Sequence, residues 1–165
     1  MSATGQQVTV RQAVEADDAA LLAIEKVAWT AMSGFPSFQE TLTDTFFSRS
    51  GPEAHLVAEY DGEVVGYLRL QEKYKFPEGA GVLAINGLAV APQARRLGVA
   101  SALLEAATTE GRHRHARKIT LNVHHTNLPA RHLYERHGYI TEGTHPREFV
   151  IEGAYVDALT MSKTL

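Results

Sequence analysis

Residues 85–104 contain the feature that most restricts the fold: an apolar strand that leads through a short turn into a helix. Pro92 has no backbone N–H and fixes its own φ, so we expect the strand to end near Val90. Beyond the turn, apolar residues recur at the i, i+3, i+4, i+7 spacing of a buried helical face. These residues are Ala100, Leu103, Leu104 and Ala107. The segment therefore predicts a strand–turn–helix unit within a mixed α/β domain.

The turn between this strand and this helix has the residue types of an anion-binding site. Gly98 has no Cβ and Ala100 has only a methyl group, so a ligand can approach the backbone closely. The first N–H groups of a helix are unpaired and carry partial positive charge, which suits a phosphate. Arg95 and Arg96 add two full charges. The turn is therefore expected to bind a phosphate or pyrophosphate.

Two blocks of the sequence resemble motifs of the GCN5-related N-acetyltransferase (GNAT) family. Arg95, Gly98 and Ala100 occupy the three fixed positions of its acyl-CoA-binding motif, Gln/Arg-x-x-Gly-x-Gly/Ala. Residues 127–139 are similar to the family's later signature, Asn-x-x-Ala-x-x-x-Tyr-x-x-x-Gly-Phe. The matching residues are Asn127, Ala130, Tyr134 and Gly138, with Tyr139 in place of phenylalanine. The resemblance covers residues 8–163 and is silent on the substrate.

The resemblance implies the α/β GNAT fold, a mixed and mostly antiparallel sheet with a splayed centre, flanked by about four helices. It implies acetyl-CoA as the cosubstrate, with the strand at 88–90 pairing with the pantetheine arm and the turn holding the pyrophosphate. Asn127 would cap its helix and contact the pantetheine arm. The implied cosubstrate-binding residues are Leu88, Ala89, Val90, Arg95, Arg96, Leu97, Gly98, Val99, Ala100, Ser101 and Asn127.

Tyr134 stands where the family often places the general acid that protonates the coenzyme A thiolate. A phenol with a pKa near 10 is a reasonable proton donor to a thiolate whose conjugate acid lies near 8 to 9. The alternative is a core aromatic residue on an amphipathic helix. The resemblance favours the proton donor.

The chain reads as one domain over residues 8–165, behind a flexible leader at residues 1–7. The expected strands are 8–10, 55–60, 63–70, 82–90, 118–123, 149–151 and 155–161, with Asp61-Gly62 as a hairpin turn. Gly87, inside the fourth strand, is compatible with a bulge or with close packing of a neighbouring side chain.

Four helices are expected between these strands. The first begins near Asp17 and buries Leu21, Ile24 and Ala28. The second begins at a capping box, Ser37 to Glu40, and should bury Phe38, Leu42 and Phe46. The third runs from Gly98 to a C′ glycine, Gly111. The fourth follows Asn127, buries Ala130, Leu133, Tyr134 and His137, and stops at Gly138.

The general base is not identified by the sequence. Many relatives carry a glutamate where this chain has Asn86, and another where it has Asn122, and an amide cannot accept the proton. The remaining candidates are Glu72, His124, His125 and water. Histidine titrates in the right range, but histidines in a loop are usually on the surface. Proton removal by water is therefore the preferred hypothesis.

Composition excludes several other classes of function. A net charge of −3 argues against nonspecific nucleic-acid binding, and no apolar run approaches the length of a bilayer span. Without cysteine the sequence offers no disulfide, thiol nucleophile or thiolate metal site, and cytoplasmic residence is expected. The eight histidines show no metal-binding spacing, so no metal is expected.

The sequence therefore predicts an acetyl-CoA-dependent N-acetyltransferase that transfers the acetyl group directly to a primary amine, with a small metabolite as the expected acceptor. Residues 29–40, which are aromatic and loop-like, are expected to wall the acceptor site. A homodimer is compatible with the sequence. The competing hypothesis is a noncatalytic acyl-CoA sensor or interaction module on the same fold, supported by the asparagines at 86 and 122.

Overall fold

A computed structural model describes residues 7–40, 42 and 44–165 of the chain. Its strands are β1 (Thr9–Gln12), β2 (His55–Tyr60), β3 (Glu63–Glu72), β4 (Val82–Val90), β5 (Lys118–His124), β6 (Ile140–Ile151) and β7 (Ala154–Thr164). Its helices are α1 (Asp18–Ala28), α2 (Pro36–Glu40), α3 (Val99–His113) and α4 (Leu128–Arg136). The order of strands and helices matches the prediction. The flexible leader lies outside the described residues except for Gln7.

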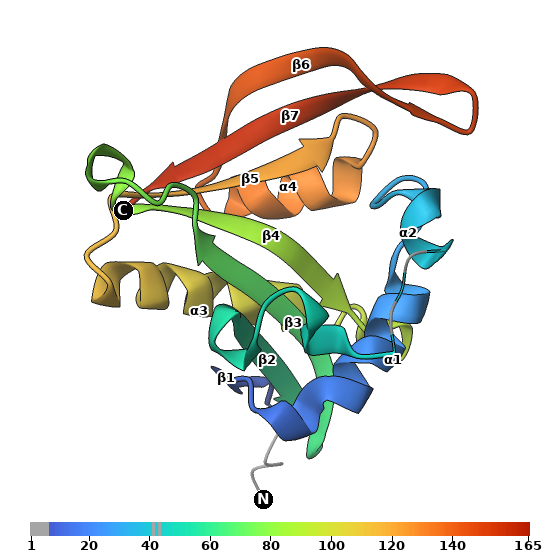
Figure 1. The fold of residues 1–165 in the computed structure, drawn as a ribbon, viewed down its shortest axis with the longest axis vertical. Helices are drawn as coiled ribbons and strands as arrows, with labels where there is room; N and C mark the ends of the chain where they lie inside the picture. Colours follow the sequence, from blue (N-terminus) through green and yellow to red (C-terminus); the bar gives the residue numbers. More distant parts are fainter. Residues whose placement is uncertain (1–6, 41, 43) are drawn as a thin grey trace, which may run out of the picture.

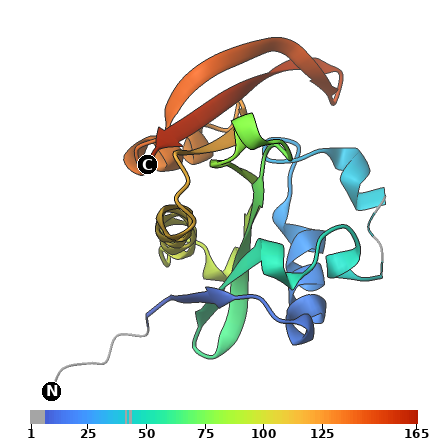
Figure 2. The same ribbon diagram turned by 60° about the vertical axis from the view of Figure 1, so that its left-hand side comes forward.

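The strands form one sheet in the order β1-β2-β3-β4-β5-β7-β6. Every neighbouring pair is antiparallel except β4 and β5, which run parallel. Helices α3 and α4 cover one face, while α1 and α2 lie over the other (Figure 2). Beyond β5, the β6–β7 hairpin extends past the rest of the sheet (Figure 1). The predicted GNAT fold is thus confirmed.

Helix α3 packs on the sheet through most of the predicted apolar face: Leu103, Leu104 and Ala107 are buried, whereas Ala100 is only partly buried and lines a cleft. Val99, which was not predicted to face the sheet, is also buried, and a Cβ added at Gly66 of β3 would lie 2.9 Å from Val99 Cγ1. The prediction that Gly111 ends this helix is wrong. Gly111 is buried inside it, and a Cβ there would lie 2.7 Å from Leu165 Cδ1. The glycine therefore serves close packing, not termination.

The second helix also differs from its prediction. Helix α2 has five residues, and the Phe38 side chain is 52% exposed instead of buried. Phe46 belongs to a short 3-10 turn, Phe46–Ser48, whose Phe46 and Phe47 backbone N–H groups donate to the Asp18 carboxylate at 3.1 and 2.9 Å. Residues 38, 42 and 46 therefore do not share one helical face, although their spacing is that of a helix.

A buried carboxylate joins the first strand to the first helix. Asp17 accepts two hydrogen bonds of 2.8 Å from the Arg11 guanidinium and a third of 2.8 Å from the Val14 N–H. The bonds from Arg11 hold the pKa of Asp17 below its usual value. A carboxylate with a lowered folded-state pKa stabilises the fold above its unfolded pKa, and this contribution is lost as the pH falls through the folded value.

We expect Asp17→Asn to lower the free energy of unfolding by about 2 kcal/mol at pH 7, since it removes hydrogen bonds between charged groups. Urea unfolding at pH 7 and at pH 3 would measure this. The difference between the two proteins should be smaller at the lower pH, because the contribution of a carboxylate with a lowered pKa is lost as the pH falls from its unfolded towards its folded value. An equal difference at both pH values would show that the ionised carboxylate contributes nothing.

Candidate active site

The sheet splits between β4 and β5. The two strands pair only from Val82↔Lys118 to Ile85↔Leu121, although β4 continues to Val90 and β5 to His124. On its other side β4 keeps its pairing with β3, with a register shift that skips Asn86. The backbone of 86–90 that faces β5 is therefore free of strand partners among the described residues. The predicted splayed centre is present. Of the two alternatives for Gly87, the bulge lies at the neighbouring Asn86, and a Cβ at Gly87 would also approach Tyr67 Cε2 to 3.3 Å, so both apply.

A cleft of about 1210 Å³ occupies this split. Most of the predicted site residues line it, from β4, the following turn and helix α4. These are Leu88, Ala89, Val90, Arg95, Arg96, Ala100, Asn127 and Tyr134. The remaining four do not line it directly. Val99 is buried in the core, and Leu97, Gly98 and Ser101 lie in the turn and first helical turn next to it.

The turn after β4 presents a run of free backbone amides. Among the described residues, no carbonyl accepts a hydrogen bond from the N–H groups of 96–101, and the first such bond of the helix runs from Ala102 N to Gly98 O. Gly98, the N-cap of α3, has a φ of +79°, and a Cβ built there would meet nothing within 4 Å. These amides therefore lack carbonyl partners in the described part of the chain, and the space over Gly98 is open, as a pyrophosphate site requires.

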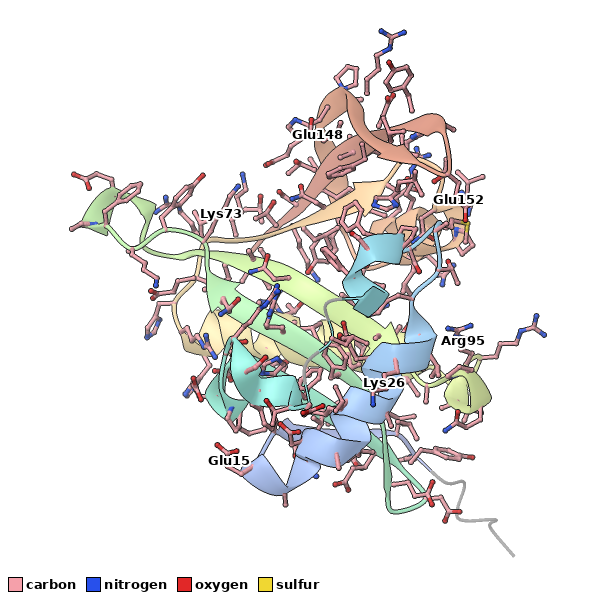
Figure 3. The ribbon with its side chains drawn as sticks, turned by 45° about the vertical axis from the view of Figure 1, so that its right-hand side comes forward. Glu15, Lys26, Lys73, Arg95, Glu148 and Glu152 are labelled. Carbon is pink, nitrogen blue, oxygen red and sulfur yellow. The ribbon has the colours of Figure 1, made fainter. Side chains whose placement is uncertain are left out.

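Arg95 also connects this turn to α1. Its Nη2 atom donates to the carbonyl oxygen of Ala28, the last residue of that helix, at 3.2 Å. Figure 3 shows Arg95 beside α1 at one side of the molecule, while Lys73 lies at the far end of β3. Cations complement the partial negative charge at a helix C-terminus, so this contact orients the guanidinium.

Tyr134 is carried into the cleft by α4. Asn127 caps this helix, its side-chain oxygen accepting from Ala130 N at 3.3 Å, and Gly138, with a φ of +88°, follows the helix end. No described residue hydrogen-bonds the Tyr134 hydroxyl group. Burial raises the pKa of Tyr134 to about 12, so the phenol is protonated at neutral pH. The helix buries its predicted face only in part, because this face borders the cleft.

Of the candidates for a general base, only His124 lies in the cleft. It packs edge-on against Phe35, with ring centroids 5.0 Å apart, and burial lowers its pKa. His125 is not part of the cleft lining, and its Nδ1 accepts the Asp157 backbone N–H at 2.8 Å. Glu72 lines a separate small recess. The histidine at 125 and the glutamate at 72 are therefore poorly placed for the chemistry.

The two asparagines are engaged in local hydrogen bonds. Asn86 Nδ2 donates to Gln71 Oε1 at 3.2 Å, and Asn122 Oδ1 accepts from Thr160 Oγ1 at 2.9 Å. Both asparagines line the cleft. They can orient neighbouring groups, but they cannot remove a proton.

Sequence reasoning missed a polar cluster on the other wall of the cleft. The Tyr67 hydroxyl group donates a hydrogen bond to the Glu25 carboxylate, and Arg69 lies two residues further along β3. Burial, followed by the Glu25 charge, raises the pKa of Tyr67. From the sequence alone, Glu25 would be placed on the solvent-exposed side of α1. Its one sequence signal for a position near the core is that it follows the apolar Leu21 by four residues, at the border of the buried face.

Aromatic contacts cover the part of the cleft next to His124. Phe35, from the segment predicted to wall the acceptor site, packs against Phe149 of β6, with ring centroids 4.6 Å apart. Phe35 also contacts His124 and Phe38. The loop after α1 and the β6–β7 hairpin thus meet over this part of the cleft.

Comparison with known proteins identifies the family. Residues 19–139 match the Acetyltransferase (GNAT) family, and the chain belongs to this family. It is 36% identical over 84 residues to the uncharacterised N-acetyltransferase YhfO of Bacillus subtilis, covering 51% of this chain and 56% of that protein. It is 35% identical over 127 residues to the L-amino acid N-acetyltransferase AaaT of Escherichia coli, covering 76% of this chain and 74% of that protein. The chain thus spans little more than half of the Bacillus relative.

A solved structure extends the likeness to the whole fold. The ribosomal-protein-alanine N-acetyltransferase of Brucella melitensis is 26% identical, with a TM-score of 0.77 over 95% of this chain and 99% of that one. Within the described part of the chain, no helix is long and apolar enough to cross a membrane. The same residues contain no group of three or more histidine, aspartate or glutamate side chains arranged to hold a metal ion.

Proposed function

We propose that this protein transfers an acetyl group from acetyl-CoA directly to the primary amine of a small metabolite. The observation that carries the proposal is the continuity of one cleft, from the free amides of 96–101, along the unpaired edge of β4, to Tyr134. Family membership supports the same reaction. The chain contains no cysteine to carry the acetyl group, which favours transfer without a covalent enzyme intermediate.

Each part of the cleft has a distinct task in this proposal. The amides of 96–101, with Arg95 and Arg96, hold the pyrophosphate, and the free edge of β4 accepts the pantetheine arm as an added strand would. Acetyl-CoA supplies the acetyl thioester. The Tyr134 hydroxyl group gives its proton to the departing sulfur, and its raised pKa keeps that proton available over the whole working range.

A small acceptor fits the shape of the opposite end. The contact between Phe35 and Phe149 restricts the space over that end, which favours a compact amine over an extended peptide. The name of the Escherichia coli relative, an L-amino acid N-acetyltransferase, supports the same class of acceptor.

Thiol release from acetyl-CoA tests the function across a panel of amines: L-amino acids, a polyamine and a peptide with a free N-terminus. We expect steady release with at least one amino acid, and weaker or no release with the peptide. If acetyl-CoA binds but no amine in the panel accelerates thiol release, the noncatalytic sensor is the better account. The asparagines at 86 and 122 are the observation that favours the sensor.

The proton of the incoming ammonium leaves, in our proposal, through the Glu25–Tyr67 pair. A Cβ built at Gly87, beside the free edge of β4, would lie 3.7 Å from the Tyr67 hydroxyl oxygen. The pair is therefore next to the strand that accepts the thioester. The assignment of the Glu25–Tyr67 pair as the base replaces water, which the sequence alone favoured, and leaves His124 as the competing base.

We expect Glu25→Gln to lower kcat/KM about 100-fold, the usual size of a general-base contribution, and His124→Ala to lower it much less. Profiles of kcat/KM against pH would compare the two variants. In the Glu25 variant, activity should rise steadily with pH as the free amine forms, and Tyr134 should cause no alkaline loss until the pH approaches about 12. An acidic limb below the ordinary histidine value of about 6.5 that disappears only in His124→Ala would instead identify the histidine, whose pKa burial lowers.

A further inference from the structure

Arg69 is a cation in the cleft without a protein counter-ion. No described carboxylate lies within ion-pair distance of it; among the described arginines and lysines, ion pairs are formed by Arg11, with two carboxylates, and by Arg114 and Lys118. Its Nη2 donates to the Asn86 carbonyl oxygen at 3.0 Å, and its Nε is buried without a hydrogen-bond partner. A guanidinium group has five donors arranged for a planar anion. A ligand carboxylate would supply the missing charge and would accept from the guanidinium N–H groups that Asn86 leaves free.

The position of Arg69 argues against a phosphate of coenzyme A as that anion. Arg69 pairs with Gly87 on β4, whereas Gly66 pairs with Val90, the residue that leads to the phosphate turn. The two pairs are separated by three residues of β4, or about 10 Å at about 3.3 Å per residue. Arg69 thus lies beyond the expected thioester, on the side where the acceptor enters.

A group of opposite charge stands next to Arg69. Tyr67 and Arg69 point to the same face of β3, since side chains alternate along a strand. A Cβ built at Gly87 would lie 3.7 Å from the Tyr67 hydroxyl oxygen and 3.9 Å from Arg69 Cβ. The Tyr67 hydroxyl group is hydrogen-bonded to the Glu25 carboxylate. An anion and a cation therefore flank the same short stretch of β4, without forming an ion pair with each other.

We propose that Arg69 binds the carboxylate of an α-amino-acid acceptor while the Glu25–Tyr67 pair holds its amino group. The inference rests on the proposed function, because it describes the acceptor of the same reaction. An α-amino acid carries its ammonium and carboxylate on one carbon, which matches two opposite charges on one wall of the cleft. The bulge at Asn86 fixes the guanidinium through its carbonyl oxygen.

L-leucine and L-leucinamide share a side chain and differ in the carboxylate, which also raises the pKa of the amino group, so each acceptor is compared between the wild type and the variant. Arg69→Gln should lower kcat/KM for leucine about 100-fold while changing that for leucinamide less than about threefold. Arg69→Lys should recover part of the loss. Arg49→Gln, which removes another cation that lines the cleft, should leave both values unchanged.

Calorimetry of leucine binding to the protein saturated with coenzyme A gives a readout that does not need turnover. Binding of leucine that weakens in Arg69→Gln and not in Arg49→Gln supports the inference, even if no thiol is released and the proposed function fails. Equal losses for leucine and leucinamide, or leucine binding that is absent or insensitive to Arg69, would overturn it. Acetylation of a polyamine alone would keep the function and reject the inference.

Discussion

Gly98→Glu is expected to abolish measurable acetyl-CoA binding, with a loss of at least about 100-fold in affinity, because a carboxylate would stand among the amides that hold a pyrophosphate. A Cβ at Gly98 meets nothing within 4 Å, so the new side chain enters the space over the turn without displacing the core. Calorimetric titration with acetyl-CoA measures the effect.

The left-handed backbone at Gly98 requires a matched control. Any side chain at its φ of +79° costs about 1–2 kcal/mol of strain. Gly62, in the hairpin between β2 and β3, has a φ of +76° and equally open surroundings. Gly62→Glu should therefore bear the same strain and bind acetyl-CoA normally. A folded Gly98 variant that keeps wild-type affinity would show that the turn is not the phosphate site.

Tyr134→Phe should lower kcat by about 100-fold or more, the range of a lost general acid, while acetyl-CoA affinity changes little. The hydroxyl group matters when charge develops on sulfur and contributes little to binding in the ground state. Steady-state kinetics with an active acceptor, together with calorimetry, would separate the two effects.

Tyr139 offers the control for this substitution. It packs beside Tyr134, with ring centroids 6.0 Å apart, and is buried with a hydroxyl group that has no hydrogen-bond partner. Tyr139→Phe removes the same atom from the core and should leave kcat within about threefold of wild type, since an unpaired buried hydroxyl group contributes no favourable contact. If Tyr134→Phe behaves like Tyr139→Phe, Tyr134 is a packing residue and not the acid.

The parts of the fold that could be predicted are those that local sequence patterns determine. The apolar spacing of α1 and α3, the Asp61-Gly62 turn and the strand that ends before Pro92 all depend on neighbours within a few residues. Strand β6 was recognised only at its last residues, 149–151. Its earlier residues are mostly exposed at the edge of the sheet, so they carry no alternating pattern.

The candidate site divides in the same way. The phosphate turn and Tyr134 each belong to a continuous motif, so their residue types and spacing were readable. The Glu25–Tyr67 pair joins residues 42 positions apart, and Arg69 becomes distinctive only when its place beside that pair, opposite Gly87, is visible. Such contacts depend on how α1 packs across β3, which no local pattern encodes.

Transfer of a ¹³C-labelled acetyl group from acetyl-CoA to L-leucine, followed by mass spectrometry of both leucine and the intact protein, tests the central claim most directly. We predict that the label appears on the leucine amino nitrogen in an amount equal to the coenzyme A released, and that the protein remains unlabelled. Coenzyme A release without labelled leucine, a stably acetylated protein, or acetyl-CoA binding without transfer to leucine or any other amine would contradict direct transfer in this cleft.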